Sequence, residues 1–172
     1  MQVRNLKSKL LLLMTCIIIA CSAITCRVEA LAPEVKVEPS PYTAPFVGHV
    51  FDLNVNVANI EHVWSWKINA TWNKNYLRCI SVTEGDFLKN KGATLFPSPV
   101  IDNVNGRIPE ISSTLMAEDE ASGSGTLVTV RFNATALTPP GGIQVIIGDI
   151  NFADMYGAPH DPQPPGTPGT VI

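Results

Sequence analysis

The sequence predicts an all-β fold in which two sheets pack face to face. The strongest evidence is the stretch Gly48–Trp72, where apolar and polar residues alternate over 51–57 and again over 64–72. Alternation with a period of two places the apolar side chains of a strand on one face, which needs a second layer to cover it. No helical period of any length follows residue 30. We interpret the two alternating runs as adjacent antiparallel strands of a sandwich or jelly roll.

Short apolar runs separated by turn residues predict the remaining strands. The nine expected strands cover residues 35–37, 51–57, 64–72, 77–82, 94–96, 107–116, 127–134, 143–151 and 171–172. Prolines around the first strand favour an edge position, because proline cannot donate to a ladder. Asn105-Gly106 predicts a hairpin turn, and Pro109 weakens the strand after it. We expect loops at residues 117–124 and irregular chain over 157–169, which is rich in Pro and Gly.

Composition separates the first thirty residues from the rest. The whole chain has 12 basic and 15 acidic residues, and setting aside four basic residues and one acidic residue of the first thirty leaves 8 against 14, a net charge of −6. An acidic domain without a basic stripe repels phosphate backbones, so nucleic-acid binding is not expected. Cys79 is the one cysteine after residue 30. It has no intramolecular partner for a disulfide and is expected to be a small buried side chain.

Residues 1–30 have the pattern of a secretory signal, and residues 31–172 are expected to form one domain. Three basic residues precede the apolar run Leu10–Ala20, and small residues follow, with cleavage expected after Ala30. A second interpretation is lipid attachment at Cys21, and a third is an uncleaved membrane anchor, although the run is short for about 30 Å of hydrocarbon. All three place the domain outside the cell, either secreted or at the cell surface.

No catalytic motif is recognisable, and we do not expect an enzyme. The three histidines lack a partner at metal-ligand spacing, and no nucleophile elbow or phosphate loop is present. Glu84 and Asp86 could in principle act as a glycosidase pair, but solvated loop charges explain them better. The acidic run 118–120 is interpreted in the same way.

Two further binding sites are weighed against structural roles. Exposed tryptophans can stack on sugars, but the three tryptophans within 64–72 share a strand face with apolar residues, which favours the core. A calcium loop at 102–106 would place Val104 where an oxygen ligand is needed, so the hairpin turn is favoured there. Calcium remains an alternative, with oxygen ligands from Asp149, Asn151 and Asp154. No other metal or cofactor is expected.

Asn69 and Asn133 begin Asn-Ala-Thr triplets that match the N-glycosylation pattern. Both asparagines lie on the polar side of an alternating run, so we expect them to face outward. An exported protein from a host with the required machinery could carry glycans at both positions.

The chain from about residue 33 to 172 resembles the cohesin domain. The resemblance rests on four stretches in this order, which include a Gly-Asp-Phe-Leu element and a Ser-Gly-Ser-Gly-Thr-Leu entry into a strand. These stretches are Gly48–Val57, Val63–Trp72, Ile80–Leu88 and Ser122–Ala134. The resemblance implies a nine-stranded jelly-roll β-sandwich without catalytic activity.

The resemblance also implies a partner and a face. Members of the family bind dockerin modules, which are small calcium-loaded helical domains, and so attach polysaccharide-degrading enzymes to a scaffold or a surface. Their partner face is the sheet with the third, fifth, sixth and eighth strands. In this sequence the candidate residues are Ser65, Lys67, Asn69, Thr71, Gln144 and Ile146. Alternative functions are a polysaccharide-binding module of the same fold and a structural or adhesive surface domain that self-associates.

Overall fold

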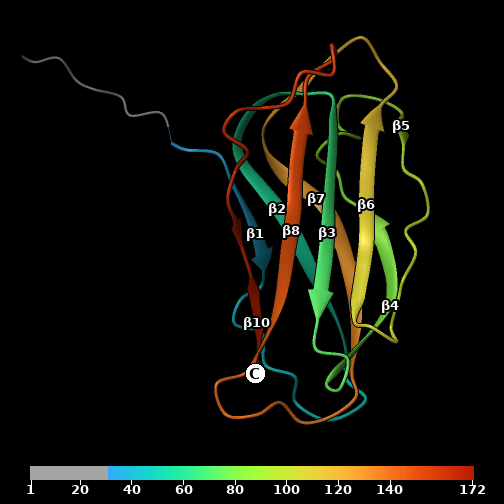
Figure 1. Ribbon diagram of the computed structural model, residues 1–172, viewed down its shortest axis with the longest axis vertical. Coiled ribbons are helices and arrows are strands. Elements are labelled where there is room, and N and C mark those ends of the chain that lie inside the picture. Colours follow the sequence, from blue (N-terminus) through green and yellow to red (C-terminus); the bar gives the residue numbers. More distant parts are fainter. Residues whose placement is uncertain (1–30) are drawn as a thin grey trace, which may run out of the picture. The chain divides into compact units, whose positions relative to one another are not determined.

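The computed structural model describes residues 31–172, which form two packed β-sheets (Figure 1). In these residues the chain contains ten strands and no helix that could cross a membrane. The strands are β1 (Glu34–Glu38), β2 (Val50–Val63), β3 (Ser65–Trp72), β4 (Leu77–Glu84), β5 (Thr94–Leu95), β6 (Arg107–Leu115), β7 (Ala121–Ala134), β8 (Ile143–Ala153), β9 (Gly166–Thr167) and β10 (Gly169–Val171). The predicted all-β sandwich is confirmed. The signal segment lies outside the described residues.

The first sheet has the strand order β4-β7-β2-β1-β9. Its central pair is β2 and β7, which run antiparallel along 14 residues each. β9, a two-residue strand, pairs in parallel with β1, so the edge position predicted for β1 is wrong. β7 begins at Ala121, earlier than expected, because the predicted loop joins the ladder through bulges. Gly125 allows a close approach there, since a Cβ at this position would lie 3.2 Å from the buried Phe87, a tight contact.

The second sheet has the order β10-β8-β3-β6-β5. Pro109 lies in β6 where the register with β3 shifts: Ile68 pairs with Ile111, but Ala70 pairs with Ile108. Two residues of β6 therefore stand opposite Asn69, which is a bulge. A proline is tolerated at such a position because no ladder bond is required from its nitrogen.

The two alternating runs are not neighbours in one sheet, contrary to the interpretation of the sequence. β2 belongs to the first sheet and β3 to the second, and Trp64 alone carries the chain across between them (Figure 1). Alternation specifies which face of a strand is apolar, but it does not specify the strand with which it pairs. Both apolar faces point into the same core from opposite sides.

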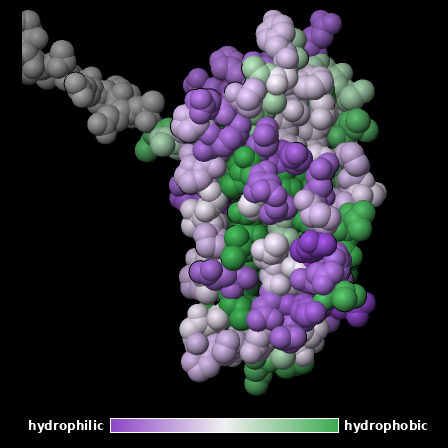
Figure 2. Space-filling model, viewed as in Figure 1, coloured by the Kyte–Doolittle hydropathy of each residue, from purple (hydrophilic) through white to green (hydrophobic). Residues whose placement is uncertain are grey.

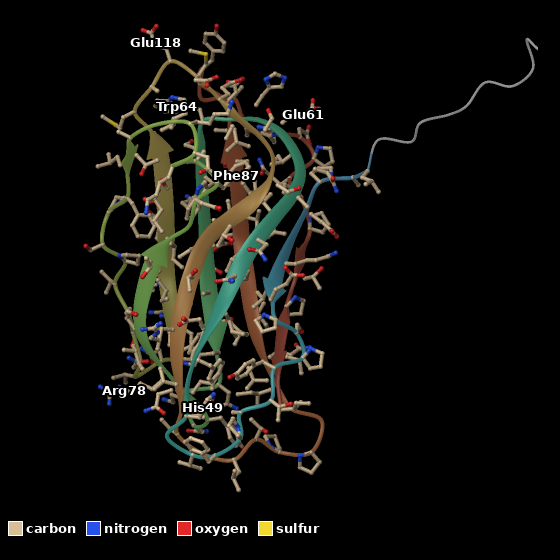
Figure 3. The ribbon with its side chains drawn as sticks, turned by 180° about the vertical axis from the view of Figure 1, so that it is seen from behind. His49, Glu61, Trp64, Arg78, Phe87 and Glu118 are labelled. Atoms are coloured by element: carbon tan, nitrogen blue, oxygen red, sulfur yellow. The ribbon has the colours of Figure 1, made fainter. Side chains whose placement is uncertain are left out.

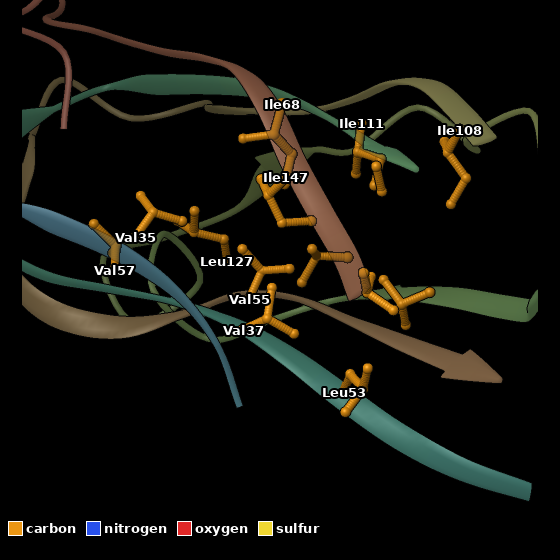
Figure 4. Close-up of a cluster of buried hydrophobic side chains, with 14 of the residues drawn as sticks. Val35, Val37, Leu53, Val55, Val57, Ile68, Ile108, Ile111, Leu127 and Ile147 are labelled. Atoms are coloured by element: carbon orange, nitrogen blue, oxygen red, sulfur yellow. The ribbon is translucent and has the colours of Figure 1, made fainter. Parts of the chain in front are cut away.

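The core fills the space between the sheets, and among the described residues its members lie within 35–171 (Figure 4). Trp66 and Trp72 are 2% and 6% exposed, and Trp64 is partly buried with its Nε1 donating to the carbonyl oxygen of Ala117 at 3.1 Å. The prediction that the tryptophans pack inward is confirmed. Residues Ala32–Ile172 are a compact unit that carries its own hydrophobic core.

Candidate functional site

The six residues predicted to contact a partner lie on one outer surface of the second sheet. In β3 the buried Trp66, Ile68 and Ala70 alternate with outward side chains, and in β8 three buried residues do the same. We call the outward side chains of these two strands and of β6 the β8–β3–β6 face. The predicted residues on it are Ser65, Lys67, Asn69, Thr71, Gln144 and Ile146. Figure 2 shows this side of the molecule as a mixture of hydrophilic and hydrophobic residues.

The strand register fixes how these residues are arranged. Thr71 lies between Ile146 on β8 and Arg107 on β6. Lys67 lies four residues earlier on β3, between Asn151 and Ser112. Four residues of strand span about 13 Å. The face therefore presents the apolar side chain of Ile146, which is 48% exposed, and the cation of Lys67, about 13 Å away along the strand direction.

Of the two cations on the face, Arg107 is paired with a carboxylate and Lys67 is not. Arg107 Nε is 3.3 Å from Asp102 Oδ2, and Asp102 also accepts hydrogen bonds from Asn105. The bonds from Asn105, together with Arg107, hold the pKa of the Asp102 carboxyl below its usual value. Among the described residues, no carboxylate lies within 4.0 Å of the Lys67 ammonium. Lys67 is therefore an exposed cation available to an external partner.

Asn69 is engaged at the centre of the face. Its amide nitrogen donates to the carboxylate of Asp149, across a bulge where β3 and β8 shift register. Gly148 lies opposite Asn69, and a Cβ at that position would lie 2.9 Å from Asn69 Oδ1. A glycan on Asn69 would displace the contact with Asp149. Asn133, the other predicted glycosylation residue, lies on the first sheet between Arg78 and Val50.

Sequence reasoning missed several residues of this face because the bulge at Pro109 interrupts the period of β6. Arg107 and Glu110 point outward from β6, on either side of Pro109. Leu95 on β5 is 57% exposed and pairs with Thr114, which extends the surface beyond β6. The buried Ile108 and Ile111, three residues apart, were the only local sign of the bulge.

The interpretation of Glu84 as a solvated loop charge is wrong. Its side chain is 7% exposed, and its carboxylate accepts hydrogen bonds from Ser113 Oγ at 2.5 Å and Thr94 Oγ1 at 2.9 Å. Lys89 Nζ lies 3.2 Å from the same carboxylate. Glu84 belongs to the first sheet, and the two hydroxyl donors belong to the second. The carboxylate therefore joins the two sheets, through partners that are too distant in sequence to be recognised.

The oxygen-rich loops considered for calcium have structural roles. Asn103 bonds to both backbone groups of Cys79 at 2.8 and 2.9 Å, closing the end of β4. Asp154 Oδ1 accepts from the backbone nitrogens of Tyr156 and Ala158. Within residues 31–172, no three His, Cys, Asp or Glu side chains are grouped as metal ligands. Asp86, the other residue of the carboxylate pair, caps Thr126 N at 3.0 Å.

Cys79 is buried, as expected from its position in an apolar run. Burial raises the pKa of its thiol to about 11. The thiolate is the reactive form, so this cysteine is unreactive near neutral pH. Cys21, the candidate for lipid attachment, lies outside the described residues.

The outer face of the first sheet is built differently from the β8–β3–β6 face. Asp52 and Arg131 form two hydrogen bonds of 2.8 Å each across β2 and β7 (Figure 3 views the molecule from this side). Two further cross-strand bonds follow along the same strands, Thr129 Oγ1 to Asn54 Oδ1 at 2.8 Å and Thr126 Oγ1 to Asn56 Oδ1 at 2.9 Å. We call this set the β2–β7 ladder. Its side chains are hydrogen-bonded to one another across the two strands.

Comparisons with known proteins agree with this architecture. The family model of the cohesin domain matches residues 35–171. A non-cellulosomal cohesin from the hyperthermophilic archaeon Archaeoglobus fulgidus is similar, with a TM-score of 0.62 and 21% identity over 82% of this chain and 90% of that chain. A type II cohesin domain from the cellulosome of Acetivibrio cellulolyticus gives a TM-score of 0.69 and 14% identity, covering 82% of this chain and 95% of that chain.

A third similar structure is a type I cohesin–dockerin complex from Clostridium thermocellum, with a TM-score of 0.65 and 13% identity over 83% of this chain and 100% of that chain. No curated protein sequence matches. The family model spans most of the chain, and the matched structures share its fold. The chain therefore belongs to the cohesin domain family.

Proposed function

We propose that this protein is a non-catalytic binding module that recognises a dockerin module through its β8–β3–β6 face. The observation that carries the proposal is the difference between the two outer faces. The side chains of the β2–β7 ladder are hydrogen-bonded to one another, whereas Lys67 and Ile146 are exposed without an internal partner among the described residues. Solved cohesins of this fold in complex with dockerins support the same class of partner.

Each group of the face has a chemical role in this proposal. Ile146 provides the apolar contact, since burying an exposed aliphatic side chain contributes about 1.5 kcal/mol or more. Lys67 attracts a carboxylate of the partner and orients the encounter. The small polar side chains around them supply hydrogen bonds at strand spacing. They are Ser65, Asn69, Thr71 and Gln144.

The location and the wider role are part of the same proposal. We infer that residues 1–30 direct the domain out of the cell, where it links a dockerin-bearing protein to a surface assembly or to polysaccharide degradation. Cleavage after Ala30, lipid attachment at Cys21 and glycosylation at Asn69 or Asn133 are separate expectations. Mass spectrometry of the protein isolated from its host measures all of them at once.

The proposal is tested by calorimetric titration of residues 31–172 with a panel of purified, calcium-loaded dockerin modules. At least one module is expected to bind in calcium and to be released by a chelator, because a dockerin folds around its metal. Binding of none of the panel, or binding that ignores the chelator, would reject the proposal. Sedimentation with insoluble polysaccharides then tests the sugar-binding alternative, which the inward tryptophans do not favour.

A further inference from the structure

The two ends of the sandwich carry opposite charge and lie far apart. Figure 3 shows His49 and Arg78 at one end of the long axis and Glu61, Trp64 and Glu118 at the other. We call the first the basic end, formed by loops 43–49, 73–76, 103–106 and 135–142, with the adjoining strand residues. The second is the acidic end, formed by the end of β2 and loops 116–120 and 154–161.

The loops of the acidic end form one connected surface. Glu120 joins them, since its carboxylate lies 2.9 Å from His62 Nδ1 and accepts a hydrogen bond from Met155 N at 2.9 Å. Tyr156 is 87% exposed and Met116 is 65% exposed. Six carboxylates belong to this end. One of them, Asp119, forms an ion pair with a lysine, Lys91, at 3.6 Å. The six are Glu61, Glu118, Asp119, Glu120, Asp154 and Asp161.

The loops of the basic end are connected in the same way. Gly48 N donates to Ala134 O at 2.7 Å, and Thr135 N donates to Tyr76 O at 2.7 Å. Several apolar side chains are exposed on these loops and on the first residue of β2. They are Phe46 at 59%, Val47 at 52%, Val50 at 46%, Val104 at 75% and Leu137 at 71%.

Two cations mark the basic end. Lys74 and Arg78 line one hollow together with Leu77, Asn103, Val104 and Thr135. Lys74 is held there by a hydrogen bond from Nζ to Val104 O of 2.6 Å. No carboxylate among the described residues lies within 4.0 Å of either cation. The nearby Arg107 is already paired with Asp102. The positive charge of Lys74 and Arg78 is therefore not neutralised within the domain, although the net charge of the domain is negative.

We propose that the protein associates head to tail, with the basic end of one copy against the acidic end of the next. The ends are complementary in charge, and both expose apolar side chains that such a contact would bury. A contact between two different patches propagates into a filament or closes into a ring. The contact leaves the β8–β3–β6 face free along the side of each copy, so an assembly would present that face repeatedly. The association does not depend on dockerin binding.

An anionic membrane surface is the other ligand that the basic end could meet. It would use the cations and the exposed apolar side chains of that end, but it would leave the acidic end unexplained. A second copy accounts for both ends with surfaces that the chain itself contains. The screening length at physiological ionic strength is about 8 Å, and it shortens as salt is added. Added salt should therefore weaken the attraction between the two ends and reduce the association.

The test is analytical ultracentrifugation of residues 31–172 over a range of protein and salt concentrations. We expect the mean mass to rise with protein concentration at low salt and to fall to the monomer at high salt. The variant Lys74→Glu/Arg78→Glu should weaken association by at least about tenfold, since it places like charges at the contact. The single reversals Lys74→Glu and Arg78→Glu should each weaken association, whereas the control Lys36→Glu, which makes the same change in net charge as either on the side of the first sheet, should still associate.

A charge exchange separates the proposal from loss of folding. The variant Glu61→Lys/Glu118→Lys should also associate more weakly alone. Its equimolar mixture with Lys74→Glu/Arg78→Glu should form pairs again, because the unchanged basic end of the first variant can meet the unchanged acidic end of the second. A wild-type protein that is monomeric under all conditions would overturn the proposal, as would an unrestored mixture of folded variants. Sedimentation with anionic vesicles in place of self-association would instead assign the basic end to a membrane surface.

Discussion

The outer faces of the two sheets have the same alternating pattern in sequence but differ in what the outward side chains meet across the strands. On the first sheet the register brings acceptors opposite donors, as in Asp52 with Arg131 and Asn54 with Thr129. On the second sheet Lys67 stands opposite Asn151 and Ser112, neither of which is an anion. The side chains of the β2–β7 ladder are therefore paired with one another, whereas Lys67 is available to a partner. The difference shows that polarity alone does not distinguish a binding face from a solvated one.

The largest expected effect compares two isoleucines of nearly equal exposure, Ile146 at 48% on β8 and Ile80 at 47% on β4. Ile146→Asp should reduce affinity for a bound dockerin module by about 2 kcal/mol or more, roughly thirtyfold, as expected for a buried apolar contact at an interface. Ile80→Asp adds the same charge to the first sheet and should leave affinity unchanged. Titration calorimetry measures both variants. Equal losses in the two would show that the faces are not functionally different.

The second effect concerns the carboxylate that joins the sheets. Glu84→Ala leaves Ser113 and Thr94 without their acceptor in a nearly buried position, which should cost about 2 kcal/mol of unfolding free energy. Glu84→Gln keeps the shape and one acceptor oxygen and should cost less. Urea denaturation at neutral pH measures the difference. If Glu84→Ala is as stable as the wild type, the carboxylate of Glu84 does not contribute to holding the two sheets together.

A smaller effect is expected from the exposed cation of the binding face. Lys67→Ala should weaken dockerin binding by about 1 kcal/mol, roughly fivefold, mainly through the association rate, and the loss should shrink as salt is added. Lys36→Ala removes a cation from the first sheet, where Lys36 is paired with Glu34, and should have no effect on binding. Surface plasmon resonance at two salt concentrations separates the rates. A loss that persists at high salt would assign Lys67 a packing role.

The smallest effect tests the internal satisfaction of the first face. Hydrogen bonds from Arg131 lower the pKa of Asp52 in the folded state. A depressed pKa contributes stability that is present above the unfolded value near 4 and is lost as the pH falls through the folded value. Asp52→Asn should therefore be slightly less stable than the wild type at pH 7, and the gap should close at the lowest pH. A gap that does not change with pH would show that the pair is not coupled electrostatically.

The alternation of apolar and polar residues was sufficient to predict the position and the buried side of strands in which it is not interrupted. The central parts of β2, β3, β7 and β8 were predicted on this basis, and the inward and outward sides of β3 and β8 followed directly. The pattern failed where a bulge changes the period, as at Pro109, and where a strand is too short to show one, as in β9. It also could not show that β2 and β3 pair with different neighbours.

The sequence by itself determined that this protein is an all-β sandwich, that its tryptophans pack inward, and that the six candidate residues point away from the core. Burial of apolar surface orients the strands whose apolar residues alternate without interruption, and this alternation can be recognised within a single stretch of sequence. Only the tertiary structure decided which strands are hydrogen-bonded and which side chains face one another across the sheets. The burial of Glu84 and the separation of charge between the two ends depend on residues distant in sequence. Such pairings follow from register and topology, which no single stretch of chain contains.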